Sequence, residues 1–142
     1  MQPTRLDTVM TANPAACSRD TPLREVARMM REHDCGLIPV VDAQHKPLGV
    51  VTDRDIATRA VAEGKDPASC SAGDYMSAPV KSVPMDSTLA DCCEAMEAGQ
   101  VRRMPVVDAQ GRLCGIVSQA DVALSGHDAE TVEVVKEVSR PH

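Results

Sequence analysis

The sequence predicts an α+β fold made of two β-α-β-β-α repeats, with an added helix at the C-terminal end. The first observation is a duplication. Residues 39–55 (PVVDAQHKPLGVVTDRD) recur without a gap 66 residues later, at 105–121 (PVVDAQGRLCGIVSQAD), with nine of 17 positions identical. The second observation is a pattern that both copies share. Each reads as an apolar strand, a turn, a second apolar strand and a polar ending, and each follows a stretch with helical spacing of apolar residues.

The duplication extends beyond these copies and sets the domain boundaries. At the same offset Met10 aligns with Met76, Asp20 with Asp86, Leu23 with Leu89 and Met30 with Met96. We therefore expect repeat one at residues 5–64, a linker at 65–70, repeat two at 71–126 and a C-terminal helix or tail at 127–142. Repeats of this size often cannot bury their apolar faces alone, so the two are expected to pack with pseudo-two-fold symmetry.

Repeat one begins with a short helical turn at residues 5–10 and a short strand at 15–17. A helix is expected to follow Asp20-Thr21-Pro22, because a capping residue followed by Pro is typical of a helix start. Its apolar face repeats at i, i+3, i+4 and i+7 and consists of Leu23, Val26, Ala27 and Met30.

A hairpin follows, with strands at 36–41 and 47–51 around a turn at 42–46. Thr52 then opens a second helix that ends at Gly64 and carries Ile56, Ala57, Ala60 and Val61.

Repeat two is expected to copy this order. Its short strand is residues 80–83, and its hairpin strands are 101–107 and 113–117. The first helix is marked by Leu89, Cys92, Cys93 and Met96, and Ser118 opens the second. In the tail, helical spacing of Val132, Val135 and Val138 predicts the added helix.

Composition narrows the class of partner. The chain has no Trp or Phe and a single Tyr, which argues against stacking platforms for single-stranded nucleic acid. The net charge is −6 and there is no basic run, so no nucleic-acid partner is expected. Its apolar runs are too short to span a bilayer, and residues 1–10 do not read as a signal peptide, so we expect no membrane partner and a cytoplasmic location.

The polar endings of the two hairpins are the candidate functional residues. Thr52 with Asp55, and Ser118 with Asp121, have the spacing of a helix capping box, which is one reading of both pairs. The other reading is a ligand site with the same geometry. A helix N-terminus favours phosphate, and a carboxylate one turn into the helix can accept from ribose hydroxyls.

Taken together, these features resemble the CBS-domain family, and specifically a stand-alone tandem pair, or Bateman module. The resemblance covers residues 6–124 and rests on the gapless duplication, the β-α-β-β-α order, the IPVVD and MPVVD strands, and the GVVTDRD and GIVSQAD endings. Among stand-alone members the chain is most similar to small bacterial two-CBS proteins associated with stress or dormancy, through its REHD, TDRDI and VRRMP segments.

The resemblance implies roles for individual residues. Thr52 and Ser118 would lie near phosphate, and Asp55 and Asp121 would bind ribose. The residues expected to wall an adenine, or else to belong to the core, are Ile38, Met104, Ala16 and Cys17, with Ser82 and Val83 in the second copy.

The resemblance also implies unequal sites. Of the Arg102-Arg103 pair, strand alternation favours Arg103 as the cleft-facing phosphate ligand, the alternative being two solvated arginines. Because Asp53 and Arg54 become Gln119 and Ala120 in the second copy, repeat one carries more charge and is the preferred phosphate site.

The thiols and histidines give no recognisable catalytic or metal site. Five of the six cysteines align with an apolar residue of the other copy and read as core, whereas Cys70, in the linker, is expected to be exposed. His33 and Cys35 lack two further ligands for zinc, so no metal is expected. No P-loop, GxGxxG or HExxH motif occurs, so the chain is not expected to be an enzyme.

The predicted function is a regulatory, ligand-sensing module that binds an adenine nucleotide (AMP, ADP or ATP, or a related adenosyl ligand) in the cleft between repeats. No cofactor is required. The family also implies a homodimer and an unidentified protein effector that reads the ligand-induced change. Two alternatives stay open, a structural or stress-response dimer without nucleotide binding and a thiol redox sensor.

Overall fold

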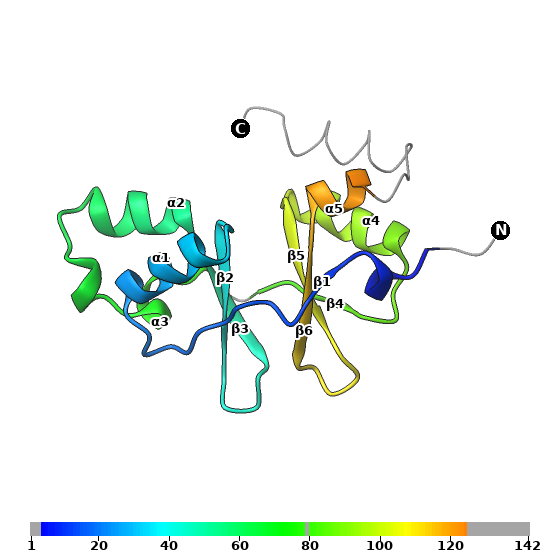
Figure 1. The fold of residues 1–142 in the computed structure, drawn as a ribbon, viewed down its shortest axis with the longest axis horizontal. Coiled ribbons are helices and arrows are strands. Elements are labelled where there is room, and N and C mark those ends of the chain that lie inside the picture. The colour runs from blue at the N-terminus through cyan, green and yellow to red at the C-terminus, as the bar shows by residue number, and fades with distance from the viewer. Residues whose placement is uncertain (1–3, 79, 125–142) are drawn as a thin grey trace. The chain divides into compact units, whose positions relative to one another are not determined.

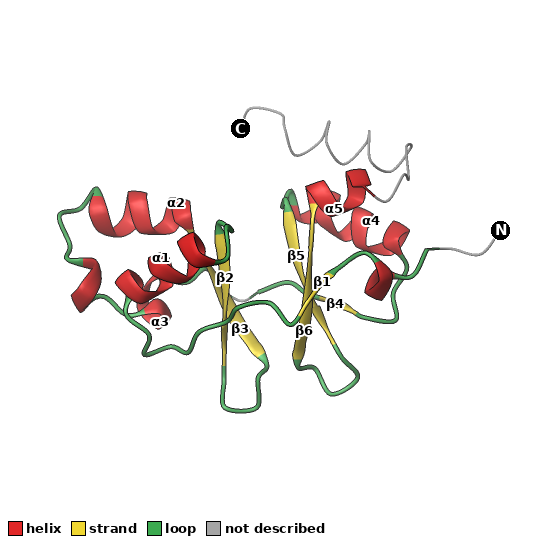
Figure 2. Ribbon diagram, in the orientation of Figure 1, coloured by secondary structure: helices red, strands yellow, loops and turns green. Residues whose placement is uncertain are grey.

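A computed structural model describes residues 4–78 and 80–124 of the chain (Figure 1). Within these residues the chain divides into two compact units, one formed by residues 14–80 and the other by residues 4–13 together with 81–124. Both units combine helices with a small β-sheet, and Figure 2 shows these elements by type. The predicted α+β fold is therefore confirmed. The C-terminal helix expected at residues 127–142 lies outside the described residues.

The sheet of the unit 14–80 is built on the predicted hairpin. Strand β2 (Leu37–Val41) pairs antiparallel with β3 (Pro47–Thr52). The short strand expected at residues 15–17 is reduced to one parallel bridge, in which the Cys17 amide donates to the Pro39 carbonyl at 2.9 Å. On the other side of the hairpin, Ser77 bridges Val50 of β3. The sheet is thus a hairpin flanked by single bridges.

Helix α1 (Leu23–Glu32) covers this hairpin with its apolar stripe, because Leu23, Val26 and Met30 are buried. Ala27 was expected on the same face but is exposed. Pro22 was expected at the first helical position but is the N-cap of α1, so the helix begins one residue later than predicted. The Thr21 hydroxyl accepts from the Ser18 amide at 3.1 Å and does not cap the helix.

The second helix of repeat one begins as α2 (Asp53–Asp55) and continues as a π-helix, η2 (Ile56–Val61). Its Ala62 amide donates to the Ala57 carbonyl, five residues back, at 2.9 Å. The wider turn keeps Ile56 and Ala60 buried but leaves Ala57 exposed and Val61 57% exposed. Of the four residues predicted to form the apolar face of this helix, two are therefore buried.

The other unit has a four-stranded sheet in the order β1-β6-β5-β4. Strands β5 (Arg103–Val107) and β6 (Leu113–Ser118) form the predicted antiparallel hairpin. Strand β4 (Val83–Pro84) pairs parallel with β5, and β1 (Thr11–Ala12) pairs antiparallel with β6. Helices α4 (Leu89–Gly99) and α5 (Gln119–Leu124) complete the unit.

In each compact unit, one short segment comes from the repeat that forms the other unit. Residues 4–13, which contain the 3-10 helix η1 (Leu6–Thr8), pack with repeat two, whereas α3 (Ala72–Tyr75) packs with repeat one. The hydrogen bonds repeat at the 66-residue offset. The Leu6 amide donates to Ser87 at 3.1 Å, and the Ala72 amide donates to Thr21 at 2.8 Å.

A methionine on each segment lies against a strand glycine. A Cβ built on Gly49 would lie 2.8 Å from the Sδ of Met76, and a Cβ on Gly115 would collide with the Sδ of Met10. Since a side chain at either position would displace the segment, glycine is required for this close approach.

Both hairpin turns are held by the aspartate that precedes them. Oδ1 of Asp42 accepts from the amides of Gln44 and Lys46, each at 2.9 Å. Asp108 repeats both bonds with Gln110 and Arg112, again at 2.9 Å. The backbone hydrogen bonds from Arg112 and Gln110, helped by the Arg112 guanidinium, hold the pKa of the half-buried Asp108 carboxyl below its ordinary value.

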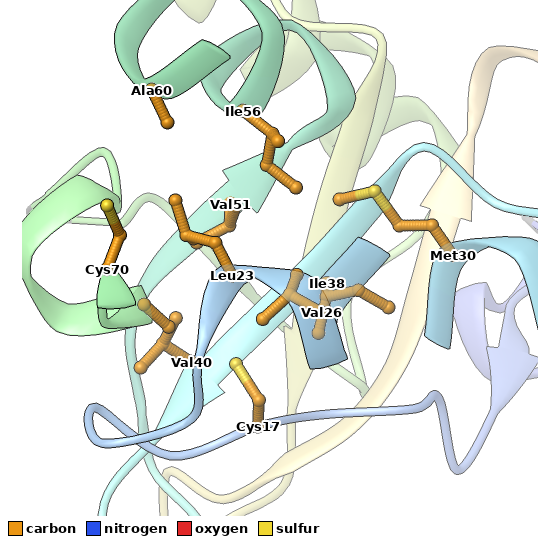
Figure 3. Packing of buried hydrophobic residues seen from close by; sticks show 11 residues of the cluster. Cys17, Leu23, Val26, Met30, Ile38, Val40, Val51, Ile56, Ala60 and Cys70 are labelled. Atoms are coloured by element: carbon orange, nitrogen blue, oxygen red, sulfur yellow. The ribbon is translucent and has the colours of Figure 1, made fainter. Parts of the chain in front are cut away.

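Each unit has its own hydrophobic core, and Figure 3 shows that of repeat one. Cysteines contribute to both cores, Cys17 and Cys70 to one and Cys92 and Cys93 to the other. Cys70 was expected to be exposed, and that prediction is wrong. The chain around it docks on repeat one, where the Leu23 amide donates to the Cys70 carbonyl at 2.8 Å. Its side chain consequently enters the core.

Candidate functional site

The Thr52–Asp55 pair forms a complete capping box at the start of α2. The Asp55 amide donates to Oγ1 of Thr52 at 3.1 Å, and the Thr52 amide donates to Oδ2 of Asp55 at 2.9 Å. The backbone here is positioned by the end of β3, because the Asp53 amide donates to the Gly36 carbonyl at 2.9 Å. The strand therefore delivers both side chains, half-buried, to one fixed place.

The Ser118–Asp121 pair forms the same reciprocal bonds at the start of α5. The Asp121 amide donates to Oγ of Ser118 at 3.1 Å, and the Ser118 amide donates to Oδ2 of Asp121 at 2.8 Å. The Gln119 amide donates to the Arg102 carbonyl at 2.8 Å, which matches the bond from Asp53 to Gly36 in the first copy. The capping reading of both pairs is confirmed by these bonds.

The capping hydrogen bonds do not use all the donor and acceptor groups of the two motifs. Each hydroxyl accepts one bond, so its own proton stays available for donation. Each carboxylate uses Oδ2, and among the described residues no hydrogen bond reaches Oδ1 of Asp55 or Asp121. Each motif thus offers one hydroxyl donor and one carboxylate acceptor, which is what a ligand carrying both an acceptor oxygen and a hydroxyl group needs.

Sheet register separates the predicted site residues into two groups. Thr52 is the cross-strand partner of Leu37, and Ser118 is the partner of Arg103. Cross-strand partners project from the same face of a sheet, so the exposed Arg103 shares the face of Ser118. Ala16, half-buried and one residue before the Cys17 bridge, alternates to the face of its sheet opposite Cys17.

Most of the remaining predicted residues lie in the cores, whereas Ser82 is exposed. The exposed fractions are 0% for Ile38, 1% for Met104 and 6% for Cys17, and Val83 is buried with them. Ile38 and Met104 pair with Val51 and Val117, one residue before each capping hydroxyl, and therefore point to the opposite face. As adenine walls these side chains would be inaccessible, whereas as core residues they are well placed. Figure 3 shows Ile38 and Cys17 among the other core side chains.

Gln119 was not among the residues predicted for the site. Its Nε2 is buried, and no hydrogen-bond partner for that atom is present among the described residues. It directly follows Ser118 in the sequence, at the position where repeat one has Asp53. Its position one residue after a capping hydroxyl was a signal available in the sequence. A buried amide donor without a partner is costly, so this group can serve a ligand acceptor.

A surface hollow of repeat one lies elsewhere. It has a volume of about 440 Å³ and is lined by Ser18, Arg19, Asp20, Val41, Asp42, Ala43 and Leu48. These residues lie at the turn end of the hairpin, away from Thr52, and include none of the residues predicted for ligand binding.

Metal and thiol chemistry find little support in the described residues. No group of three or more His, Cys, Asp or Glu side chains within them is placed to hold a metal ion. Burial raises the pKa of Cys17 to about 11, and burial together with neighbouring Cys93 raises that of Cys92 to about 12. Both thiols are therefore protonated at neutral pH, which lowers their reactivity.

Comparison with known proteins identifies the family. A family model for the CBS domain matches residues 6–62 and again 72–127. The chain belongs to the CBS-domain family and is a CBS-pair regulatory module with the Bateman fold. No helix among the described residues is long and apolar enough to cross a membrane.

Two relatives illustrate the similarity in sequence. Hypoxic response protein 1 of Mycobacterium tuberculosis is 33% identical over 133 residues, which cover 94% of this chain and 92% of the relative. The uncharacterized protein MK0525 of Methanopyrus kandleri is 38% identical over 98 residues, or 69% of this chain. The match spans only 50% of MK0525.

Two solved structures support the same assignment. The crystal structure of Hypoxic Response Protein I with two coordinated zinc ions has a TM-score of 0.78 and 34% identity, covering 85% of this chain and 98% of that chain. The CBS domain pair of protein MJ0100, in complex with 5-methylthioadenosine and S-adenosyl-L-methionine, has a TM-score of 0.78 and 25% identity, covering 89% and 99%.

Proposed function

We propose that this CBS pair is a non-enzymatic sensor that binds an adenine nucleotide or a related adenosyl ligand at the Thr52–Asp55 and Ser118–Asp121 motifs. The ligand acts as a regulatory signal, and the protein acts as a homodimer whose state is read by a protein effector. The observation that carries the proposal is the unused chemistry of the two capping boxes. Within the described residues, each presents a hydroxyl proton and a carboxylate oxygen that no hydrogen bond uses, from a fixed backbone.

These groups match the polar parts of an adenosyl ligand. The carboxylate Oδ1 of Asp55 or Asp121 accepts from a ribose hydroxyl, as acids do in dinucleotide-binding folds. The hydroxyl of Thr52 or Ser118 donates to a phosphate oxygen. Because these side chains are already held by the capping bonds, little conformational entropy is lost when they bind.

The second motif is the better phosphate site. Arg103 shares the sheet face of Ser118, and Gln119 adds a buried amide donor beside it. In the first motif the corresponding residues are the apolar Leu37 and the acidic Asp53, which disfavour an anion. This differs from the sequence-based preference for repeat one, which rested on the additional charged residues Asp53 and Arg54. An adenosyl ligand without phosphate suits the Thr52 motif better.

The comparisons support the ligand class. The MJ0100 pair, 25% identical, binds two adenosyl ligands that lack phosphate, 5-methylthioadenosine and S-adenosyl-L-methionine. The zinc ions of Hypoxic Response Protein I do not carry over in the same way, since the described residues of this chain hold no three-ligand cluster. The proposal therefore includes no metal.

Isothermal titration calorimetry with AMP, ADP, ATP, 5-methylthioadenosine and S-adenosyl-L-methionine tests the proposal. The diagnostic variants are Asp55→Asn and Asp121→Asn. An asparagine oxygen can still accept the capping bond from Thr52 or Ser118, so the fold is kept, whereas the second anionic oxygen is lost. We expect Asp121→Asn to weaken phosphate-bearing ligands and Asp55→Asn to weaken the two ligands without phosphate, each by about tenfold or more.

Two results would count against the proposal. Absence of binding by every ligand at millimolar concentration would favour a structural or stress-response dimer without nucleotide binding. Binding that survives both asparagine substitutions would remove the motifs from the site. A thiol redox sensor would instead show a change of mass and of oligomeric state after mild peroxide treatment.

A further inference from the structure

Met10 and Met76 hold equivalent places in the two compact units. Met10 lies in the segment 4–13 that packs with repeat two, and Met76 lies in the segment 72–78 that packs with repeat one. The two residues are 66 positions apart, which is the offset of the duplication. We call them the paired methionines. Their equivalence means that a chemical change at one of them is expected to have the same effect at the other.

Each of the paired methionines packs its thioether against a strand glycine of its own unit. The three heavy atoms nearest to a Cβ built on Gly115 all belong to Met10, namely Sδ, Cγ and Cε. A Cβ built on Gly49 would lie 2.8 Å from Sδ and 3.1 Å from Cγ of Met76, and 2.7 Å from the Ser77 carbonyl oxygen. The glycine side of either sulfur consequently has no room for one more heavy atom.

The methionine contact lies beside the hydrogen bonds that join each segment to its sheet. Directly after Met76, the Ser77 amide donates to the Val50 carbonyl at 2.8 Å, and the Val50 amide donates to the Ser77 carbonyl at 3.1 Å. Directly after Met10 comes β1, which has only two residues. Because the strand pairing is this short, loss of the methionine packing would weaken it.

The paired methionines are more accessible to a small oxidant than the methionines of the cores. Both are half-buried, whereas Met30, Met96 and Met104 are buried. A thioether has no proton to lose, so it reacts at neutral pH without ionising. The thiols of Cys17 and Cys92, by contrast, stay protonated because burial raises the pKa of each.

We propose that Met10 and Met76 are the sites of a reversible oxidation that releases the two segments from their sheets. The oxidant is a peroxide such as hydrogen peroxide. The sulfur lone pair attacks one peroxide oxygen, an S–O bond forms and the O–O bond breaks. The departing hydroxide takes the proton of the transferred hydroxyl and leaves as water, so the thioether loses two electrons to become a sulfoxide. This modification goes beyond the proposed function and does not depend on ligand binding.

A sulfoxide does not fit where the thioether does. Its oxygen needs room, which the strand glycine does not leave, and a hydrogen-bond donor in place of water. The polar atom nearest to a Cβ on Gly49 is the Ser77 carbonyl oxygen, which is itself an acceptor and already takes the Val50 amide. Oxidation therefore combines overpacking with an unpartnered polar group, and both are relieved when the segment leaves the sheet.

Peroxide treatment of the full chain, followed by peptide mapping and hydrogen exchange, tests the proposal. We expect the paired methionines to gain one oxygen atom each before the buried methionines of the cores do. Amides in residues 4–13 and 72–78 should then exchange about tenfold faster or more, because overpacking by one atom weakens docking by a factor of that order. Methionine sulfoxide reductases, one for each epimer, should restore slow exchange.

Leucine substitution separates the paired methionines from the others. Met10→Leu with Met76→Leu keeps an apolar side chain of similar volume but removes the sulfur, so peroxide should leave the exchange of both segments unchanged. The matched control is Met29→Leu with Met85→Leu, which removes two likewise half-buried methionines that pack on the two cores. The control should respond to peroxide as wild type does. Met10→Gln with Met76→Gln, which places a polar amide at both positions, should speed exchange without any oxidant.

Other results would overturn the inference. If Met29 and Met85 gained oxygen while Met10 and Met76 stayed unmodified, the paired methionines would not be the accessible sites. Oxidation of the paired methionines without faster exchange in their segments would mean that the sheets accommodate the sulfoxide. A peroxide response that persists in the double leucine variant, or oxygen mapped to Cys35 in place of methionine, would assign the effect to other groups. The wild-type measurements decide the proposal even if a variant fails to fold.

Discussion

Replacing Leu6 by alanine should destabilise the core of repeat two, although Leu6 belongs to repeat one in the sequence. The side chain is fully buried in the core that contains Leu89, Met96 and Val117. Truncation of a buried leucine costs about 2–5 kcal/mol, depending on how far the cavity can collapse. Here collapse is restricted, because the Leu6 amide is bonded to Ser87 at 3.1 Å and the Leu89 amide to Thr4 at 2.9 Å.

We therefore expect a loss of about 3 kcal/mol in the free energy of unfolding. With a urea m-value of about 2 kcal/mol/M, the midpoint would fall by roughly 1.5 M. Hydrogen exchange read by mass spectrometry locates the effect, and amides in α4 and β6 should exchange faster while those in α1 and β2 stay protected. Val26→Ala, an equally buried position in the other unit, is the control and should show the reverse pattern. A loss under about 1 kcal/mol, or faster exchange confined to residues 23–52, would refute the docking of this segment on repeat two.

Three further predictions concern Gly49, Cys92 and Asp108. Gly49→Ala places a methyl group 2.8 Å from the Sδ of Met76 and 2.7 Å from the Ser77 carbonyl oxygen, so it should destabilise by about 1–3 kcal/mol in urea unfolding; an unchanged midpoint would contradict the close approach. Burial raises the folded pKa of Cys92 to about 12, so its stabilising contribution is complete below the unfolded value of about 8.5 and is lost as pH rises toward 12. Cys92→Val, which copies Val26 of the other repeat, should flatten the fall in stability between pH 8 and 10, and an unaltered pH profile would argue against this account. The pKa of Asp108 is lowered in the folded protein, so its carboxylate contributes to folding stability above about pH 4, and this contribution is lost as pH falls through the lower folded pKa. The free energy of unfolding measured from pH 2 to 5 should therefore vary less in Asp108→Asn than in wild type.

The hairpins and the two motifs could be predicted from sequence because their signals are local. Val40 and Val106 are buried in strands whose near-continuous apolar runs predict cover on both faces. The capping boxes are fixed by a spacing of three residues, and both formed as that spacing predicts. Leu23 and Met30 are buried because their spacing defines one helical face, which the gapless duplication then repeats in Leu89 and Met96.

Other features required the tertiary structure. Leu6 is buried in the core of repeat two and Cys70, in the linker, in the core of repeat one, and no local pattern encodes a contact across tens of residues. The π-helix displaces Val61 from the core face because one hydrogen bond spans five residues, a choice made by packing. Register likewise places Arg103 on the same sheet face as Ser118, and Ile38 and Met104 on the face opposite the capping hydroxyls.

For this protein, the sequence by itself determined the repeat, the strands and helices that carry the motifs, and the donor and acceptor groups at Thr52, Asp55, Ser118 and Asp121. These depend on spacings of two to seven residues, which backbone geometry converts directly into local structure. The tertiary structure decided which candidate side chains remain accessible and which segment completes each unit. Those outcomes depend on burial between residues distant in sequence, where packing and register outweigh local preference.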